Sequence, residues 1–583
     1  MEMMESACRR GRGGEEGMED ELRQSILVAE HVKKAAAEAE CFRSECAEIG
    51  RKVNHLASML RSETLGAAAV APAVYHRPFQ WILAEANKVL FGSLFLLRKF
   101  RRSGLFRRVV YSAVFSSNFR GVLSAIDSSL ANLPWLISLY SGSGVVVGLI
   151  PSSSIDPLLS RTWSRIATIE MASTASDRAE AAVSLANFAI ESSRNNRIIV
   201  EEGGVPPLLS LLSDDSSVDA QVAATAALHN VACDPDHIFL LLEERTAPLL
   251  VHLLSISPMI LQSRLASLIS RMASHPLARE EFARESAVRP LIALLSFELP
   301  LDESNPSTKI QSLDTALNHS SSTPAPAADK ESPELKHALK VACSEAIWKL
   351  SIDSPANKHK IAETNGLLCL AKLIEVGKGD LQHNCLMAVV EFATAAETDV
   401  DLRRAAFKAN SPTTKSVADQ LLRVANQGGS NISHVAAAIQ AIGSLARAFS
   451  ASEIGVLRTL VIHLEHWDRD VAAEAAIALG KFVCSENYNC TQNAKAIVEF
   501  GGVRRSMRLL RPGEKTMIPA LRLLCYLSLY AAGSEAFERT MALSALESLG
   551  RAPGGQHPLV KDLLRKAVDQ LELHVGGPST LTR

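Results

Sequence analysis

The apolar positions of this chain recur in one short helical pattern along most of its length. The pattern reads small, apolar, any residue, a variable residue, apolar and small, which puts an apolar stripe on a helix with the variable residue at its edge. Its copies are SLANFA (184–189), ALHNVA (227–232), LISRMA (268–273), AIWKLS (346–351), AVVEFA (388–393), AIGSLA (441–446), ALGKFV (478–483) and LLCYLS (523–528), with a weaker ninth, KAVDQLEL, at 566–573. Most copies are roughly 40 to 47 residues apart, so the chain is predicted to repeat one helical unit.

A second helix repeats ahead of several of these copies. Its sequences are GGVPPLLSLL, RTAPLLVHLL, SAVRPLIALL, NGLLCLAKLI and GGVRRSMRLL. The glycine pairs at 203–204 and 501–502 suit a tight turn that needs a positive φ or a close backbone approach. The stretch 195–232 contains all parts in order and has the composition of one complete armadillo repeat. We therefore predict an all-α, right-handed armadillo-repeat α-solenoid over residues 156–575, with about eight repeats and a C-terminal cap.

The variable position of the pattern is expected to line the concave face, where such solenoids bind their partners. The candidate groove residues are Asn187, Asn230, Arg271, Lys349, Glu391, Ser444, Lys481 and Tyr526, and Gln570 takes the same place in the cap. Importin-α-like receptors use a ladder of groove asparagines, each with a tryptophan four residues earlier. Only two of the candidate groove positions are asparagines, and the residue four positions before each groove residue is never a tryptophan. A function in nuclear import is therefore disfavoured.

The charges that replace the asparagines favour a different ligand. Arg271, Lys349 and Lys481 set three cations against the single carboxylate of Glu391, as in a catenin-type groove that pairs with acidic residues of an extended ligand. The alternative is that these side chains only solvate the groove.

The first 140 or so residues lack the repeat and form a second module. Cys46, Ile49, Val53 and Leu56 belong to one apolar stripe on a helix, and further helices are expected before it, at 78–103 and at about 118–140. We predict a four-helix bundle at 19–141, after a disordered N-terminus at 1–18 and before a linker at 142–155. A flexible tail is expected at 576–583.

The bundle contains the largest charge asymmetry of the sequence. Its basic residues include Arg98, Lys99, Arg101, Arg102, Arg107, Arg108 and Arg120, with no acidic residue between Ala86 and Ile126 and with aromatic residues interleaved. Such a cluster can attract anionic lipid or an acidic protein partner. The favoured alternative is a solvated helix end and loop whose aromatics are core.

Two segments are predicted to be inserts in the solenoid. Residues 301–334 are rich in Ser, Thr, Pro and Ala and too polar to pack, which predicts a disordered loop. Thr323 and Ser332 each precede a proline, which makes them candidate phosphorylation sites. The alternative, a plain tolerated insertion, is favoured. A shorter insert is expected at 402–415, where mixed basic and apolar residues favour an ordered contact surface.

Composition and motifs exclude several function classes. A net charge of −2 gives no whole-molecule case for nucleic-acid binding. The ten cysteines show no CxxC pair or metal-ligand spacing, so free thiols are expected, with no metal and no cofactor. No nucleophile, zinc or phosphate-loop motif of an enzyme is present, which predicts a protein without catalytic activity or small-molecule substrate.

The sequence has no recognisable signal or lipidation motif, which predicts a cytoplasmic protein with at most peripheral membrane contact. The longest uncharged window, 128–155, is broken by Pro134, Pro151 and several glycines. A transmembrane helix is therefore not expected there.

Three segments resemble one known family. DELRQSILVAEHVKKAAAEAECFRSECAEIGRKVNHLASMLR near the start, DLRRAAFKANSPTTKSVADQLL in the middle and EAAIALGKFVCSENYNCTQNAKAIVEFGG toward the end are similar to the plant armadillo-repeat-only proteins. The resemblance implies a non-enzymatic scaffold near the plasma membrane, linked to Rho-type small GTPases, their GTPase-activating proteins and polarised growth.

The N-terminal module also resembles, more loosely, the four-helix bundles of the necroptosis pseudokinase and of plant helical-bundle immune receptors. That likeness keeps an alternative open, in which the chain is an adaptor in ubiquitination or immune signalling with an oligomerising or membrane-acting bundle.

Overall fold

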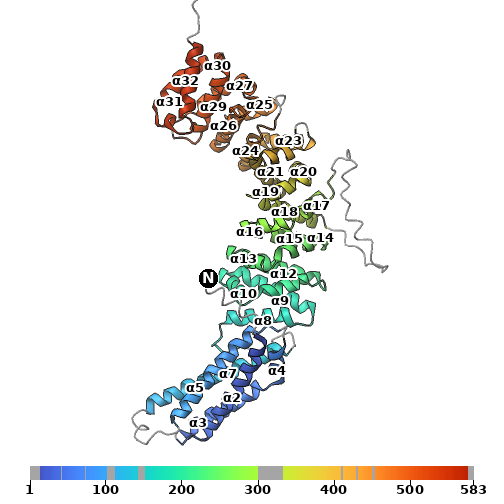
Figure 1. Ribbon diagram of the computed structural model, residues 1–583, viewed down its shortest axis with the longest axis vertical. Helices are drawn as coiled ribbons and strands as arrows, with labels where there is room; N and C mark the ends of the chain where they lie inside the picture. The colour runs from blue at the N-terminus through green and yellow to red at the C-terminus, as the bar shows by residue number, and fades with distance from the viewer. Residues whose placement is uncertain are drawn as a thin grey trace, which may run out of the picture. The chain divides into compact units, whose positions relative to one another are not determined.

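A computed structural model describes residues 14–40, 42–71, 74–100, 112–141, 151–299, 332–408, 411–427, 431–449, 454–511 and 513–575. Throughout these residues the regular elements are helices, and no strand occurs. The chain divides into two compact units, Met1–Thr246 and Ala247–Arg583. Figure 1 shows the helices of both, coloured along the chain. The expected all-α class is confirmed.

The first unit begins with the expected four long helices. They are α2 (Gly14–Ala37), α3 (Arg43–Leu60), α5 (Arg77–Phe100) and α7 (Ser112–Tyr140). Helix α2 packs against α3 and α5, and α7 packs against the same two helices, which closes a four-helix bundle. The predicted apolar stripe from Cys46 to Leu60 is buried. A short helix, α4 (Glu63–Val70), contacts α2 and α7 and was not anticipated.

Two features at the edges of the bundle differ from expectation. Helix α2 begins at Gly14, and Met18 is buried, so residues 14–18 belong to the bundle and not to a disordered N-terminus. Within the expected linker, the Asn132 side chain accepts from Ser152 N at 2.8 Å and donates to Ser154 Oγ at 3.2 Å. These bonds hold the last part of the linker against α7. Residues 1–13, 142–150 and 576–583 lie outside the described residues.

Helix α7 is also long and apolar enough, over Ser117–Tyr140, to cross a membrane by length and composition. In this structure it is a bundle helix that packs against α3 and α5, and Asp127 on it pairs with Lys52 of α3 at 2.7 Å. A core helix of a bundle meets the same criteria of length and composition.

The rest of the first unit contains repeat helices. They are α8 (Pro157–Met171), α9 (Ala175–Glu191), α10 (Ser193–Glu201), α11 (Val205–Ser213), α12 (Val218–Val231) and α13 (Pro235–Glu243). Ser192 and Ser217 cap the first turns of α10 and α12 through their side chains. Between α10 and α11, Gly203 has φ +77°, and a Cβ on Gly204 would lie 2.8 Å from Ile199 Cγ2. The glycine pair therefore shows both features predicted from the sequence, a positive φ at Gly203 and a close approach at Gly204.

Trp163 joins the bundle to the first repeat helices. It lies on α8, is buried, and its ring is 5.8 Å from that of Trp81 and 6.4 Å from that of Trp135 between centroids. Its Nε1 donates to the Glu202 carboxylate at 2.7 Å, while the hydroxyl of Tyr75 donates to the Glu202 carbonyl oxygen at 2.7 Å. The bundle therefore covers the apolar end of the repeat stack, which every solenoid must shield.

The second unit continues the repeats as helix triplets. Its helices are α14 (Thr246–Ile256), α15 (Met259–Met272), α16 (Pro276–Arg284), α17 (Val288–Ser296), α18 (Pro333–Ser351), α19 (Pro355–Glu363), α20 (Gly366–Val376), α21 (Asp380–Thr398), α22 (Val400–Ala406), α23 (Pro412–Asn426), α24 (Ile432–Ser444), α25 (Ile454–His463), α26 (Arg469–Val483), α27 (Cys490–Glu499), α28 (Gly502–Arg508), α29 (Met517–Ala531), α30 (Glu535–Arg539), α31 (Ala542–Arg551) and α32 (Lys561–Val575). The third helices α15, α18, α21, α24, α26, α29 and α32 pack in succession. Their stacking is the predicted solenoid architecture.

The two expected inserts have different outcomes. Helix α18 begins at Pro333 and Ser332 caps it, so the end of the segment 301–334 is helical, while 300–331 and with them Thr323 lie outside the described residues. The prediction of a second insert at 402–415 was wrong. Residues 402–415 contain most of the first helix of a repeat, α22, and the start of α23, and Leu402 and Phe407 are buried. The spacing between Glu391 and Ser444 is long because α21 continues beyond Glu391 to Thr398 and because α23 has 15 residues.

Candidate functional site

Every predicted groove residue lies on a third helix. Asn187 and Asn230 are on α9 and α12 in the first unit, and Arg271, Lys349, Glu391, Ser444, Lys481, Tyr526 and Gln570 are on α15, α18, α21, α24, α26, α29 and α32 in the second. Asn187 and Arg271 are exposed, and most of the others are half-buried. The pattern therefore identified equivalent helix positions, although their side chains have different environments.

Asn230 is engaged within the protein. Its Nδ2 donates to the Ala186 carbonyl oxygen of α9 at 2.9 Å, and its own carbonyl oxygen accepts from Asn196 Nδ2 at 3.0 Å. These bonds tie α12 to α9 and α10. Asn230 therefore contributes to stacking between repeats, and its amide is already used.

Two groove residues of α18 and α21 face charged or aromatic neighbours. Lys349 Nζ lies 3.8 Å from the centroid of the adjacent Trp348 ring, a cation–π contact. Burial lowers the pKa of the Lys358 ammonium, and the negative charge of Glu391 opposes this shift only in part. Neither residue lines the hollow described next.

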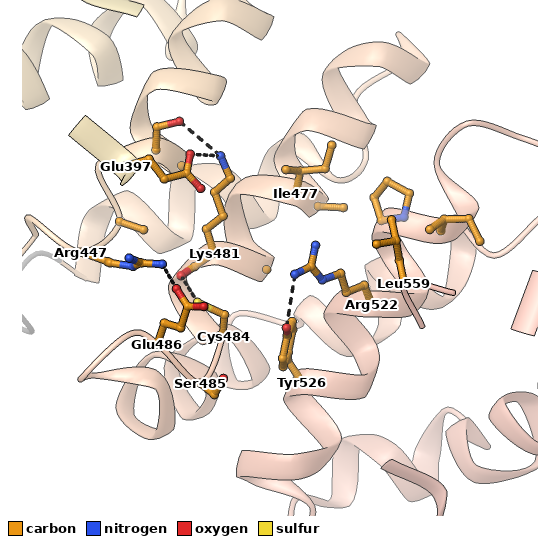
Figure 2. A pocket seen from close by; sticks show the side chains of 17 residues that line it. Glu397, Arg447, Ile477, Lys481, Cys484, Ser485, Glu486, Arg522, Tyr526 and Leu559 are labelled. Atoms are coloured by element: carbon orange, nitrogen blue, oxygen red, sulfur yellow. Dashed lines mark hydrogen bonds and ion pairs between the residues drawn. The ribbon is translucent and has the colours of Figure 1, made fainter. Parts of the chain in front are cut away.

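Three predicted groove residues do meet in one hollow, which has a volume of about 440 Å³ (Figure 2). Its lining residues include Ser444, Lys481 and Tyr526, together with Glu397, Arg447, Ile477, Cys484, Glu486, Ile518, Pro519, Arg522 and Leu559. Most of them belong to the consecutive third helices α24, α26 and α29. The hollow is therefore a part of the surface on which the sequence placed the groove.

The cations of the hollow differ in how they are paired. Lys481 Nζ lies 2.6 Å from Glu397 Oε2 and donates to Ser444 Oγ at 3.2 Å. Arg447 pairs with Glu486. Arg522 instead contacts Tyr526, with its guanidinium 5.7 Å from the ring centroid and Nη2 3.4 Å from the hydroxyl oxygen (Figure 2).

No carboxylate of a described residue lies within salt-bridge distance, 4.0 Å, of the Arg522 guanidinium. The sequence had named Lys481 as a groove cation for acidic ligands. In the structure Lys481 already has an internal carboxylate, whereas the exposed Arg522 lacks one among the residues described. Arg522 was not among the predicted groove residues.

The described members of the basic cluster lie on two bundle helices. Arg98 and Lys99 are exposed at the end of α5, and Arg120 is exposed on α7, whereas Arg101, Arg102, Arg107 and Arg108 lie outside the described residues. Sequence reasoning missed two aromatic side chains beside them. Phe91 and Phe95 of α5 are 48% and 71% exposed, and with Arg98 they follow a helical spacing of four and three residues. One face of α5 therefore carries exposed aromatics and cations together.

No cluster of metal-ligating side chains occurs among the residues the structure describes. The thiol of Cys369 is buried, and burial raises its pKa to about 12. Such a thiol stays protonated at neutral pH and is a poor nucleophile or metal ligand.

Comparisons with known proteins match two parts of the chain. Residues 192–233 match the armadillo/β-catenin-like repeat, and residues 19–141 match a domain of unknown function, DUF7792. The first match covers α10 to α12 and confirms the armadillo assignment made from 195–232. No curated protein matches the chain.

Two solved structures are similar at low sequence identity. A crystal structure of an engineered protein is 19% identical over 72% of this chain and 99% of its own, with a TM-score of 0.48. Computationally designed armadillo repeat proteins for modular peptide recognition are 17% identical over 49% of this chain and 99% of theirs, with a TM-score of 0.37.

Proposed function

We propose that this chain is a non-enzymatic protein-binding scaffold whose third helices hold an extended segment of a partner protein. The observation that carries the proposal is the hollow on α24, α26 and α29, where Ser444, Lys481 and Tyr526 meet. An armadillo stack presents the same helix position again and again, so one extended chain can contact several repeats in register.

The chain resembles the plant armadillo-repeat-only proteins. On this ground we propose that its partners are regulators of Rho-type small GTPases, above all their GTPase-activating proteins, in polarised plant cell growth. Proximity labelling in plant cells with the full chain tests this assignment. Enrichment of such regulators is the expected result. Their absence from the labelled set would contradict the assignment. It would not test the proposed groove, for which a separate experiment follows.

The groove itself is tested by capture of a Rho GTPase-activating protein with the full-length chain. Ile477 is 38% exposed in the hollow, and Ile477→Asp removes apolar contact and places a carboxylate beside Lys481, one helical turn away, and near Arg522, where it competes with an acidic residue of the partner. Capture should fall by about tenfold or more. Ile462→Asp, at a 57% exposed position on α25, is the matched control and should capture normally. Equal capture by both variants would contradict binding in the hollow.

We also propose that the bundle holds the scaffold at an anionic membrane surface. The face of α5 with Phe91, Phe95, Arg98 and Lys99 supports this, because each basic residue near such a surface contributes about 1 kcal/mol and each aromatic adds apolar contact. A cytoplasmic protein with peripheral plasma-membrane contact fits this arrangement.

Flotation with vesicles containing phosphatidylserine tests the membrane contact. Phe91→Ser with Phe95→Ser should weaken flotation by about tenfold or more. Leu27→Ser, at a 60% exposed position on α2, is the control and should float like the wild type. Flotation that persists unchanged in the double variant would contradict insertion of this face.

A further inference from the structure

Arg522 is the cation of the hollow that is placed to take a ligand carboxylate. It is exposed on α29, with its guanidinium held beside Tyr526. The aromatic ring restrains the long side chain, so less conformational freedom is lost when a ligand binds. A guanidinium in this position presents its planar donors to a carboxylate in a two-pronged geometry.

Apolar side chains surround this cation. Ile518 and Pro519 precede Arg522 by about one helical turn, and on one helix such residues lie on the same face. Ile477 of α26 and Leu559, which precedes α32, are 38% and 62% exposed at the same hollow (Figure 2). A ligand that covers these side chains gains apolar contact in the same hollow as the charge.

The spacing of charge and apolar surface matches an extended peptide. Pro519 is three residues before Arg522 on α29, a spacing of about 5–6 Å on a helix, and residues i and i+2 of an extended chain point to the same side about 7 Å apart. We propose that the hollow binds an extended segment with an acidic residue and a large aliphatic residue two positions apart. The carboxylate pairs with Arg522, and the aliphatic side chain packs against Ile477, Pro519 and Leu559.

The other cations of the hollow limit how many acidic residues the ligand needs. Lys481 is held by Glu397 and Arg447 by Glu486. A second ligand carboxylate would have to displace an internal one, which gains little because one ion pair replaces another. The site is therefore selective for one acidic and one aliphatic residue and gains little from a run of acidic residues. This inference rests on the proposed groove function.

The experiment uses four fluorescein-labelled peptides on one glycine–serine background. They carry Asp-Ser-Leu, Asn-Ser-Leu, Asp-Ser-Ser or Asn-Ser-Ser at their centre and are titrated with the full chain by fluorescence anisotropy. The first peptide should bind about tenfold more tightly than the Asn-Ser-Leu and Asp-Ser-Ser peptides. Arg522→Gln should remove the preference for Asp over Asn while keeping the preference for Leu over Ser.

Two further variants complete the design. Leu559→Ser should reduce the preference for Leu and keep that for Asp, and Arg551→Gln, at an exposed position on α31, is the control that should change neither. Binding with equal affinity for Asp and Asn, or an Asp preference that survives Arg522→Gln, would overturn the inference and leave the groove function standing. If no peptide binds, the inference is overturned. If the protein partner is then also captured equally by Ile477→Asp and Ile462→Asp, the groove function fails too.

Discussion

The ammonium of Lys481 on α26 lies 2.6 Å from the carboxylate of Glu397 on α21. Its second contact, 3.2 Å to Ser444 Oγ, is on the intervening helix α24. One lysine therefore links three consecutive third helices across the surface on which a ligand is proposed to lie. The carboxylate of Glu397 occupies the place that an acidic ligand would otherwise take.

Replacing Glu397 should therefore make the groove more receptive to acidic ligands. Glu397→Gln leaves Lys481 without its carboxylate, and we expect peptides with two acidic residues to bind about three- to tenfold more tightly. Fluorescence anisotropy with the full chain measures the change. Glu375→Gln, at an exposed position on α20, is the control. Unchanged or weaker binding to Glu397→Gln would show that Lys481 takes no ligand carboxylate.

The contact between α24 and α26 provides a matched pair of glycine substitutions. A Cβ on Gly443 would lie 2.8 Å from both Cα and Cβ of Ala478, whereas a Cβ on Gly480 meets nothing within 4 Å. Gly443→Ala should force the two helices apart and lower the free energy of unfolding by about 1–3 kcal/mol. Gly480→Ala should leave it unchanged or raise it by up to about 1 kcal/mol, because alanine favours the helix.

Thermal unfolding followed by circular dichroism distinguishes the two glycines. Because the second unit unfolds as part of a repeat array, the comparison is made between variants under one set of conditions. A lower Tm for Gly480→Ala than for Gly443→Ala would contradict the close approach of α24 and α26 at Ala478.

Sequence reasoning identified the fold and placed the candidate groove residues on equivalent third helices because both depend on local periodicity. Ser444, Lys481 and Tyr526 occupy equivalent places in three repeats, so finding one pattern found all three. The same reasoning explains why the glycine pair before α11 was recognised. Its turn needs a positive φ at Gly203 and a close backbone approach at Gly204, and both requirements can be read from neighbouring residues.

The ion pairing of the cations in the hollow was not predictable in this way. Glu397 lies beyond the pattern, on the last turns of the extended helix α21, and reaches Lys481 only because the helices stack with a particular offset. Glu486 lies in the loop between α26 and α27, outside the pattern. Long-range ion pairs depend on how repeats are stacked, which periodicity does not encode. For this reason Lys481 was expected to pair with an acidic residue of a ligand, and Arg522 was overlooked.

The junction of the first unit should be sensitive to Trp163. Trp163→Ala removes a buried ring and leaves the Glu202 carboxylate without its indole donor, so we expect a loss of about 3–5 kcal/mol of stability. Trp163→Phe keeps most of the packing and should lose less. Urea unfolding followed by circular dichroism measures both. Equal midpoints for Trp163→Ala and wild type would contradict a structural role for this contact.

Ser332 offers a test of the helix end beside the long insert. Its Oγ accepts from Glu334 N at 3.2 Å and Leu335 N at 3.4 Å, so it caps α18. Ser332→Ala should cost about 1 kcal/mol, and Ser332→Asp should retain the cap because a negative charge is favourable at a helix N-terminus. A phosphate at Ser332 should act in the same direction. Differential scanning calorimetry of the two variants checks the order, and an equal Tm for both would contradict the cap.

Glu474 on the groove helix α26 should make stability depend on pH. Burial raises the pKa of its carboxyl group, an effect that nearby Lys481 only partly opposes. Because the folded pKa is the higher one, both states are protonated at low pH, and stability falls as pH rises from the unfolded value, about 4.3, through the folded value. Glu474→Gln removes this loss, so its Tm should exceed that of wild type at pH 7, with the difference closing below about pH 4. The exposed Glu499→Gln is the control, and a wild-type Tm equal to that of Glu474→Gln at pH 7 would contradict the expected destabilisation by this half-buried carboxylate.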